Sequence, residues 1–491
     1  MPESQRGSQA VLLSTKEEKS QWSRGSDFLG AVCGFTLSLH SLWCLPMSII
    51  QYGGVTFLII YGAMLFAMGA PLILLEMSLG QYSGLAPAQM FQHLCPLLTG
   101  LGWAMAVFAA VRAMLDLAVI MWAAQTLCHL FSQQNIPEKF FHENVLSMRD
   151  ATLEKPGEVV GELVIALSAS CVVIFILGAA GTKTVGKVSL AIVTICFMLL
   201  AALTIRACLA PGAPSAVLTL LTPNWDALKQ PSVWLQAAQQ LVFALQLGLG
   251  AISTYSSYNP FLHNIVRDCF LVVIAHLVWI ILATILTCSL LGAAYNAKSF
   301  HLTSDLSLPS IVGHGVWLIS VTLVEKSLAT LSTGWLWAGL FFILILLVSV
   351  TSVFGYIEVI TNNLVSLRPS FLPYKPAIAF LSLVLLFLLD LLLTTRGGIH
   401  VYHLLFKFIY NYPSIVFCLL TILSTICCHG TQRLMKNLSM MSKLSFPYWV
   451  SCHLSVAYTS VLPILFSVIL FKPKKLLAKT LFSGSSCFQC F

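Results

Sequence analysis

Two charged side chains stand four residues apart within a long apolar stretch. Arg112 and Asp116 belong to the run 100–132, in which most of the other residues are apolar. Residues spaced i,i+4 share one face of a helix, and ionisable groups inside a membrane-spanning helix are costly and usually mark function. The spacing therefore predicts either a binding site for a charged solute or a structural pair in which the two charges satisfy each other.

The sequence lacks the side-chain patterns typical of an enzyme. It shows neither a nucleophile with a nearby base nor a metal-ligand spacing. Most of its 15 cysteines lie in apolar runs, where a free cysteine acts as a small hydrophobe. Cys487 and Cys490 form a CxxC beside lysines in a short tail, which favours acylation if the tail is cytosolic. We therefore expect no catalytic residues and no transition metal.

The composition excludes a soluble protein. Of the 491 residues, 58% are hydrophobic and 9% are charged, against roughly 25% charged in soluble domains. A single core cannot account for this, because globular cores stop growing at about 250–300 residues. The net charge of +8 fits the excess of Lys and Arg in cytoplasmic loops of membrane proteins rather than a nucleic-acid footprint. We expect a multi-pass membrane protein in contact with lipid, without nucleic acid.

Apolar runs of about 20 residues or more recur about eleven times. Each must be a helix, because lipid offers no partner for unpaired backbone groups. The runs are 27–50, 55–80, 100–132, 159–178, 187–208, 237–262, 267–293, 334–362, 374–394, 401–428 and 445–471.

These runs divide the chain into three parts. Residues 1–26 form a polar segment, 27–471 the transmembrane domain, and 472–491 a basic tail with cysteines. The distribution of Lys and Arg places the N-terminus in the cytosol. An odd number of spans would put the basic tail outside, against the same rule, so its side stays open, as does the choice between the plasma membrane and an intracellular membrane.

The first and sixth spans are interrupted by small and polar residues. The interruptions read GFTLSLHSLWCLP over 34–46 and LQLGLGAISTYSSYN over 245–259. Broken helices at corresponding places in two halves indicate a transporter with inverted repeats and a ligand site at mid-membrane. The alternative is that the small residues only allow close helix packing.

Residues along most of the chain resemble the neurotransmitter:sodium symporter family (solute carrier family 6). The similarity is carried by Trp22, by the segments GAPLILLEMSLGQYSG, STYSSYN and ILLVSVTSVFGYIE, and by RGGIHVYHLL. It implies an all-α membrane protein of the LeuT type, with an inverted repeat of five plus five helices and an eleventh span; a twelfth is not evident. It also implies sodium-coupled transport of a small amino acid, amine or neurotransmitter-like solute by alternating access.

The resemblance implies one retained sodium site, the family's second. Its ligands would be Gly34, Leu37, Val348, Thr351 and Ser352. Hard cations prefer oxygen ligands, and the Thr-Ser pair supplies two on one helix turn without adding charge. The alternative is that both hydroxyls bond only to their own helix.

The family's first sodium site is altered. Its two asparagines on the first helix correspond to Phe35 and Ser41, its hydroxyl on the sixth to Ala244, and its asparagine on the seventh to His276. Phe35 offers no lone pair, and imidazole is a poor sodium ligand. We expect sodium to bind, but not at this site.

Two other family features are altered as well. Of the chloride-site residues, Tyr61 and Gln240 remain, which is too few to replace the hydration of the anion. The charged outer gate corresponds to Cys44 and Phe406. We therefore expect little chloride dependence and no charged gate.

The substrate pocket that the resemblance implies contains nine residues. They are Ser38, His40, Asp116, Phe243, Gln246, Leu249, Tyr258, Ser352 and Tyr356. The predicted function is a sodium-coupled symporter, and the alternative is a non-transporting scaffold or regulator that keeps the fold. The substrate and the oligomeric state stay open.

Overall fold

The computed structural model describes residues 21–133, 156–179, 181–294, 334–409 and 412–442, together with a few isolated positions. The regular elements in these ranges are helices, and the one extended pairing among them is an isolated bridge between Val159 and Thr395. Helices satisfy their own backbone polar groups, which a chain in lipid requires. The predicted all-α class is confirmed for the described part of the chain.

Within the described residues, eight helical stretches are long and apolar enough to cross a membrane. They are Val55–Ser83, Pro96–Ser132, Gly161–Gly178, Thr182–Cys208, Ile265–Ala294, Gly334–Val365, Ser370–Thr394 and Gly398–His429. A ninth is the pair Gly25–Thr36 and His40–Gln51, which is bent by 55°. These stretches match nine of the ten apolar runs predicted before residue 430, and the remaining run, 237–262, is divided between two shorter helices. The protein is an integral multi-pass membrane protein. The run 445–471 and the tail lie outside the described residues.

The helices of the first half follow one another in the order expected for spans and short connections. They are α2 (Gly25–Thr36), α3 (Leu45–Gln51), α4 (Val55–Met64), α5 (Ala70–Ser83), α6 (Pro87–Leu94), α7 (Thr99–Gln133), α8 (Gly161–Ala179) and α9 (Thr182–Cys208). Short π-helical segments, His40–Cys44 and Leu65–Gly69, lead into α3 and α5.

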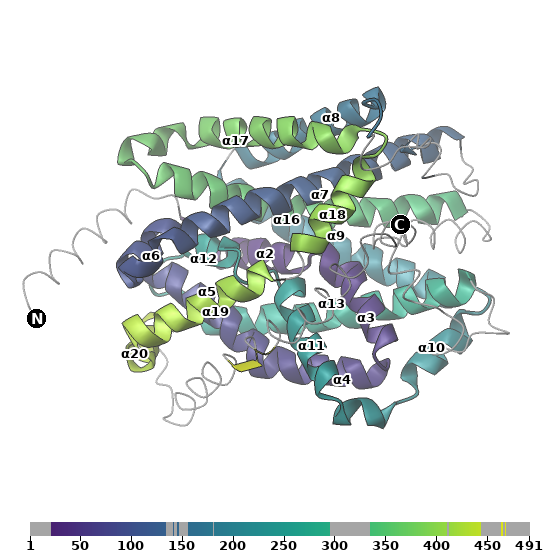
Figure 1. The fold of residues 1–491 in the computed structure, drawn as a ribbon, viewed down its shortest axis with the longest axis horizontal. Coiled ribbons are helices and arrows are strands. Elements are labelled where there is room, and N and C mark those ends of the chain that lie inside the picture. The colour runs from purple at the N-terminus through teal and green to yellow at the C-terminus, as the bar shows by residue number, and fades with distance from the viewer. Residues whose placement is uncertain are drawn as a thin grey trace, which may run out of the picture.

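The second half contains both short and long helices. They are α10 (Ala213–Leu221), α11 (Pro231–Ala244), α12 (Ala251–Ser256), α13 (Ile265–Ala294), α16 (Gly334–Val365), α17 (Lys375–Asp390), α18 (Gly398–Ile409), α19 (Pro413–Ser424) and α20 (Thr431–Ser442). The π-helical segment Thr425–His429 follows α19 directly. The long helices run side by side along the long axis of the molecule (Figure 1).

Both predicted breaks are present. The first helix stops at Thr36 and resumes at His40, and the sixth stops at Ala244 and resumes at Ala251. Inside the second break, Gly248 and Gly250 have φ of 77° and 78°, which glycine adopts without a steric penalty. The Glu76 carboxylate accepts a hydrogen bond from the Gly248 N–H at 2.7 Å, so this backbone group, freed by the break, has a partner.

Close helix contacts hold the broken segments in place. Helix α7 packs along α16, α2 packs on α9, and α12 packs on α5 (Figure 1). At the last crossing, a Cβ on Gly80 would lie 2.0 Å from the Ser253 carbonyl oxygen. The crossing therefore requires glycine, and small residues serve packing here as well as helix breaking.

Candidate functional site

The two broken helices meet each other. The Ser38 hydroxyl donates a hydrogen bond to the Ala244 carbonyl at 2.9 Å, and Ser38 is fully buried. The Ser41 hydroxyl in turn donates to the Ser38 carbonyl at 2.7 Å. Helix ends leave carbonyls without intrahelical partners, and these two serines satisfy some of them across and within the breaks.

Three of the five residues predicted for the retained sodium site lie together. The Thr351 hydroxyl of α16 is 2.8 Å from the Gly34 carbonyl of α2 and 2.9 Å from the carbonyl of Val348. Bonding of Thr351 to its own helix, the alternative considered above, is thus real but incomplete, because the contact with Gly34 links two helices. Leu37 is buried at the end of α2.

The fifth residue of that set, Ser352, faces the second break. Its hydroxyl accepts a hydrogen bond from the Gln246 side-chain amide at 3.1 Å. Gln246 is the one described residue other than glycine with a positive φ, 55°. A non-glycine residue in that region usually has a structural or functional reason. Here the reason is the position of its amide, which contacts α16.

A polar network connects α7, α16 and the second break. The Arg112 guanidinium donates two hydrogen bonds to the Tyr356 hydroxyl, at 3.2 and 3.0 Å, and that hydroxyl donates to the Gln246 side-chain oxygen. All three residues are buried. The sequence analysis placed Gln246 and Tyr356 in the pocket but did not predict that they bind each other or Arg112.

Arg112 and Asp116, for which the spacing left open a solute site or a mutually satisfied pair, have different surroundings. The long Arg112 side chain reaches the Tyr356 hydroxyl on the neighbouring helix. The Oδ2 atom of Asp116 is buried without a hydrogen-bond partner. A buried carboxylate oxygen without a partner is costly, and a cationic group beside Asp116 would reduce that cost.

Phe35, which the resemblance places at the family's first sodium site, is closely packed. The Phe35 ring lies against Gly355 so closely that a Cβ there would be 2.3 Å from Phe35 Cδ2. The same ring packs edge-on against Tyr356, with 5.5 Å between centroids. Phe35 therefore fills this space with carbon, which cannot coordinate an ion.

The two remaining chloride-site residues are each bonded to a histidine. The Tyr61 hydroxyl is 2.9 Å from His276 Nε2, and the Gln240 side-chain oxygen is 2.6 Å from His40 Nε2. The Gln240 amide also donates to the Ser48 hydroxyl at 2.9 Å. These contacts use the hydroxyl and the amide that the resemblance assigns to an anion.

Three other residues of the predicted pocket have these surroundings. Phe243 packs edge-on against His40, with 5.7 Å between ring centroids, and Leu249 is buried within the second break. Tyr258 instead donates to Glu358 at 2.5 Å. Lys375 pairs with the same carboxylate and donates to the Tyr258 hydroxyl at 2.9 Å. Tyr258 therefore binds both members of this ion pair.

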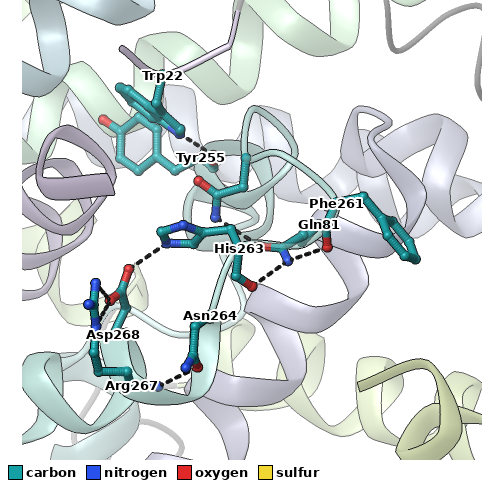
Figure 2. Close-up of polar contacts among 9 residues, drawn as sticks. Trp22, Gln81, Tyr255, Phe261, His263, Asn264, Arg267 and Asp268 are labelled. Carbon is teal, nitrogen blue, oxygen red and sulfur yellow. Dashed lines mark hydrogen bonds and ion pairs between the residues drawn. The ribbon is translucent and has the colours of Figure 1, made fainter. Parts of the chain in front are cut away.

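Trp22 ties the start of the first helix to this cluster. Its indole N–H donates to the Tyr255 carbonyl at 3.0 Å, as Figure 2 shows, and its ring packs edge-on against Tyr258. Sequence resemblance had marked Trp22, but its partners lie more than 200 residues away along the chain.

A second polar cluster lies beside Trp22 in the connection between α12 and α13 (Figure 2). The Gln81 amide of α5 donates to the carbonyls of Phe261 and His263, at 3.1 and 2.9 Å. The fully buried Asp268 binds His263 at 2.6 Å and Arg267 at 3.0 Å. This cluster fixes the connection against the end of α5, and sequence reasoning did not find it.

The positions of the family's outer gate carry no charge in the structure either. Cys44 is partly buried at the end of the π-helical segment, and Phe406 of α18 stacks on Tyr402 with 5.9 Å between ring centroids. An aromatic contact thus stands where the resemblance would place half of an ion pair.

Membrane-crossing helices, two of them broken and bonded to each other at buried polar residues, define the architecture of a secondary transporter. The fold matches that of a solved structure, MhsT in complex with L-phenylalanine, with a TM-score of 0.74 and 18% identity over 92% of this chain and 99% of that one. The family model "Sodium:neurotransmitter symporter family" matches residues 19–137 and 128–483. The protein belongs to this family.

Its curated relatives are transporters. The chain is 28% identical over 427 residues to the sodium- and chloride-dependent taurine transporter of Rattus norvegicus, covering 79% of this chain and 67% of that protein. It is 26% identical over 429 residues to creatine transporter 1 of Homo sapiens, covering 79% and 66%. It is 25% identical over 487 residues to glycine transporter 2 of Xenopus laevis, covering 86% and 60%. The match thus spans about two thirds of these relatives' length.

Proposed function

We propose that the protein is a sodium-coupled symporter that moves a small solute by alternating access, with sodium at the second site. The observation that carries the proposal is the contact between the Thr351 hydroxyl and the Gly34 carbonyl. It brings a hydroxyl of an unbroken helix to the carbonyl end of a broken one. Together with Leu37, Val348 and Ser352, these oxygens are the ligand type that a hard cation takes.

Sodium at this position would join α2 to α16. An ion shifts a conformational equilibrium only by its differential affinity for the two states. Because the ligands come from two elements that separate if the broken helix swings away, sodium favours the state in which they are together. Transport would then use one sodium ion, without chloride, since Phe35 fills the other sodium position and histidines bind Tyr61 and Gln240.

The substrate proposed is a small solute that carries both an acidic and a basic group. Taurine, creatine and glycine, named in the relatives, are of this kind. Asp116 Oδ2 offers a buried carboxylate oxygen to the basic group. Arg112 supplies the opposite charge one helix turn away, once the Tyr356 hydroxyl yields part of its hydrogen bonding.

The test compares the thermal stability of the purified protein in sodium with that in potassium. Wild type should be more stable in sodium, and the double variant Thr351→Ala/Ser352→Ala should lose the difference. Ser382→Ala is the matched control, because the Ser382 hydroxyl bonds only within α17, to Ile378 at 2.8 Å. A wild-type protein whose melting temperature is the same in both salts contradicts the sodium site.

A non-transporting role is the second candidate, and one observation favours it. Internal bonds among Arg112, Tyr356, Gln246 and Ser352 fill the middle of the site. A scaffold needs this network to persist, whereas a carrier must open it for the substrate. Uptake of an amino-acid and amine panel, with surface expression measured in the same cells, separates the two roles.

A further inference from the structure

Two adjacent cysteines lie exposed where the tenth span ends. The stretch Gly398–His429 is apolar enough to cross a membrane, and Cys427 and Cys428 directly precede its last residue. Both are exposed, whereas six other described cysteines are buried. A thiol at the boundary of a span is accessible to chemistry at the membrane surface, and juxtamembrane cysteines are the usual sites of S-acylation.

Cys428 also lines a cavity. The cavity has a volume of about 280 Å³ and lies between the end of α5, helix α6 and helix α20. Much of its wall is apolar, formed by Leu79, Leu85, Met90, Leu94, Leu434 and Met441. Cys427 does not line it. The largely apolar wall suits a hydrocarbon better than water.

The polar part of the wall is compatible with a membrane boundary. Arg433, His93 and His429 contribute cationic or neutral groups, and no carboxylate is among the described residues that line the cavity. The His429 ring is held by the Asn437 amide at 3.0 Å and packs against Tyr82. Arginine at such a boundary places its charge among lipid headgroups. The apolar part of the wall is then left to contact a hydrocarbon chain.

The cavity lies at the end of the bundle where the first span begins. Tyr82 contacts Phe261, and His263 in the same connection packs against Phe28 of α2. Helices α6 and α20 lie together at this end (Figure 1). This is the cytosolic end if the N-terminus is cytosolic, as the charge distribution predicts, and acyl-coenzyme A thioesters are available there.

We propose that Cys428 is S-acylated and that its fatty acyl chain lies in this cavity. The Cys428 sulfur attacks the carbonyl carbon of a fatty acyl-coenzyme A; the new carbon–sulfur bond replaces the one to coenzyme A. The thiol proton passes to the departing coenzyme A sulfur, so nothing is oxidised or reduced. The attached chain covers the apolar wall and packs α20 against α5 and α6.

The test uses the full chain with Cys487 and Cys490 changed to Ala, so that the tail cannot contribute. Cells are fed an alkyne-bearing palmitate, and the purified protein is treated with hydroxylamine, which cleaves thioesters. We expect hydroxylamine-sensitive label that is lost in Cys428→Ala and in Cys428→Ser but kept in Cys427→Ala. Cys128→Ala, which removes another exposed cysteine, is the matched control and should keep the label.

Three results would overturn the proposal. The first is label of wild-type intensity in both Cys428 variants, and the second is no thioester label on the wild type. The third is a disulfide between Cys428 and the neighbouring Cys95 in the protein isolated under non-reducing conditions. Surface expression of each variant shows that a lost label does not come from misfolding.

A photoreactive palmitate shows where the fatty acyl chain lies. After irradiation, cross-linked peptides should come from residues 78–94 and 434–441, which line the cavity. Cross-links confined to bulk lipid, to α8 or α17, or to residues after 442 would show that the chain lies elsewhere. Neither experiment measures transport, so the result is independent of the proposed sodium coupling.

Discussion

The Ser38 hydroxyl and the Ala244 carbonyl, 206 residues apart, form a buried hydrogen bond of 2.9 Å between the two broken helices. It is the most direct link between the two breaks, because it uses a carbonyl that the sixth helix cannot satisfy itself. A conformational change that separates the two broken helices must break this bond.

Ser38→Ala should lower stability by about 1–3 kcal/mol, the usual cost of a buried acceptor left unsatisfied. Ser41→Ala should cost less, because the Ser41 hydroxyl bonds to a carbonyl within its own break. Thermal unfolding in detergent measures both variants. An equal loss of stability in the two variants would show that the hydrogen bond between the helices contributes no more than the one within a break.

Phe35 and Gly355 are complementary in size. A Cβ at residue 355 would lie 2.3 Å from the Phe35 ring, so Gly355→Ala should destabilise by about 1–3 kcal/mol through overpacking. Adding Phe35→Ala should relieve the clash and recover part of the loss. A double-mutant cycle from thermal melts gives the coupling; additive effects would contradict the contact.

Substitution of Asp116 should abolish transport, whereas substitution of Tyr356 should lower stability. Asp116→Asn should fold normally, since Oδ2 has no hydrogen-bond partner, but should not transport. Tyr356→Phe should lower stability by about 1.5–3 kcal/mol, because it removes a hydroxyl that Arg112 binds. Melting temperature and surface-corrected uptake, measured on the same preparations, distinguish the two residues. Loss of folding in Asp116→Asn would instead assign this carboxylate a structural role.

Glu358 and Lys375 form an ion pair that also holds Tyr258. Removing one partner leaves an uncompensated, largely buried charge, so Glu358→Gln or Lys375→Met alone should cost about 2–4 kcal/mol. The double variant should be closer to wild type than either single variant. Surface expression and melting temperature test this. If both single variants are as stable as wild type, solvent screens the ion pair.

The prediction from sequence succeeded where local residue type decides. Apolar runs before residue 430 are helices, and the breaks lie where glycine and serine interrupt them, because both follow from the cost of exposing backbone in lipid. Residue type did not identify the partners that distant helices supply. The spacing of Arg112 and Asp116 could not show that Arg112 binds Tyr356 on another helix, and the position of Tyr258 could not show that it binds Glu358.

Residue type alone determined that this chain is a membrane protein, where its helices break, and that Phe35 cannot ligate an ion. Hydrophobicity, backbone permissiveness and the absence of a lone pair are properties of single residues. Tertiary structure alone decided that Arg112 binds Tyr356, that Asp116 Oδ2 is left without a partner, and that Cys428 borders a cavity. Those outcomes depend on how distant helices are rotated and spaced, which the sum of many packing contacts determines.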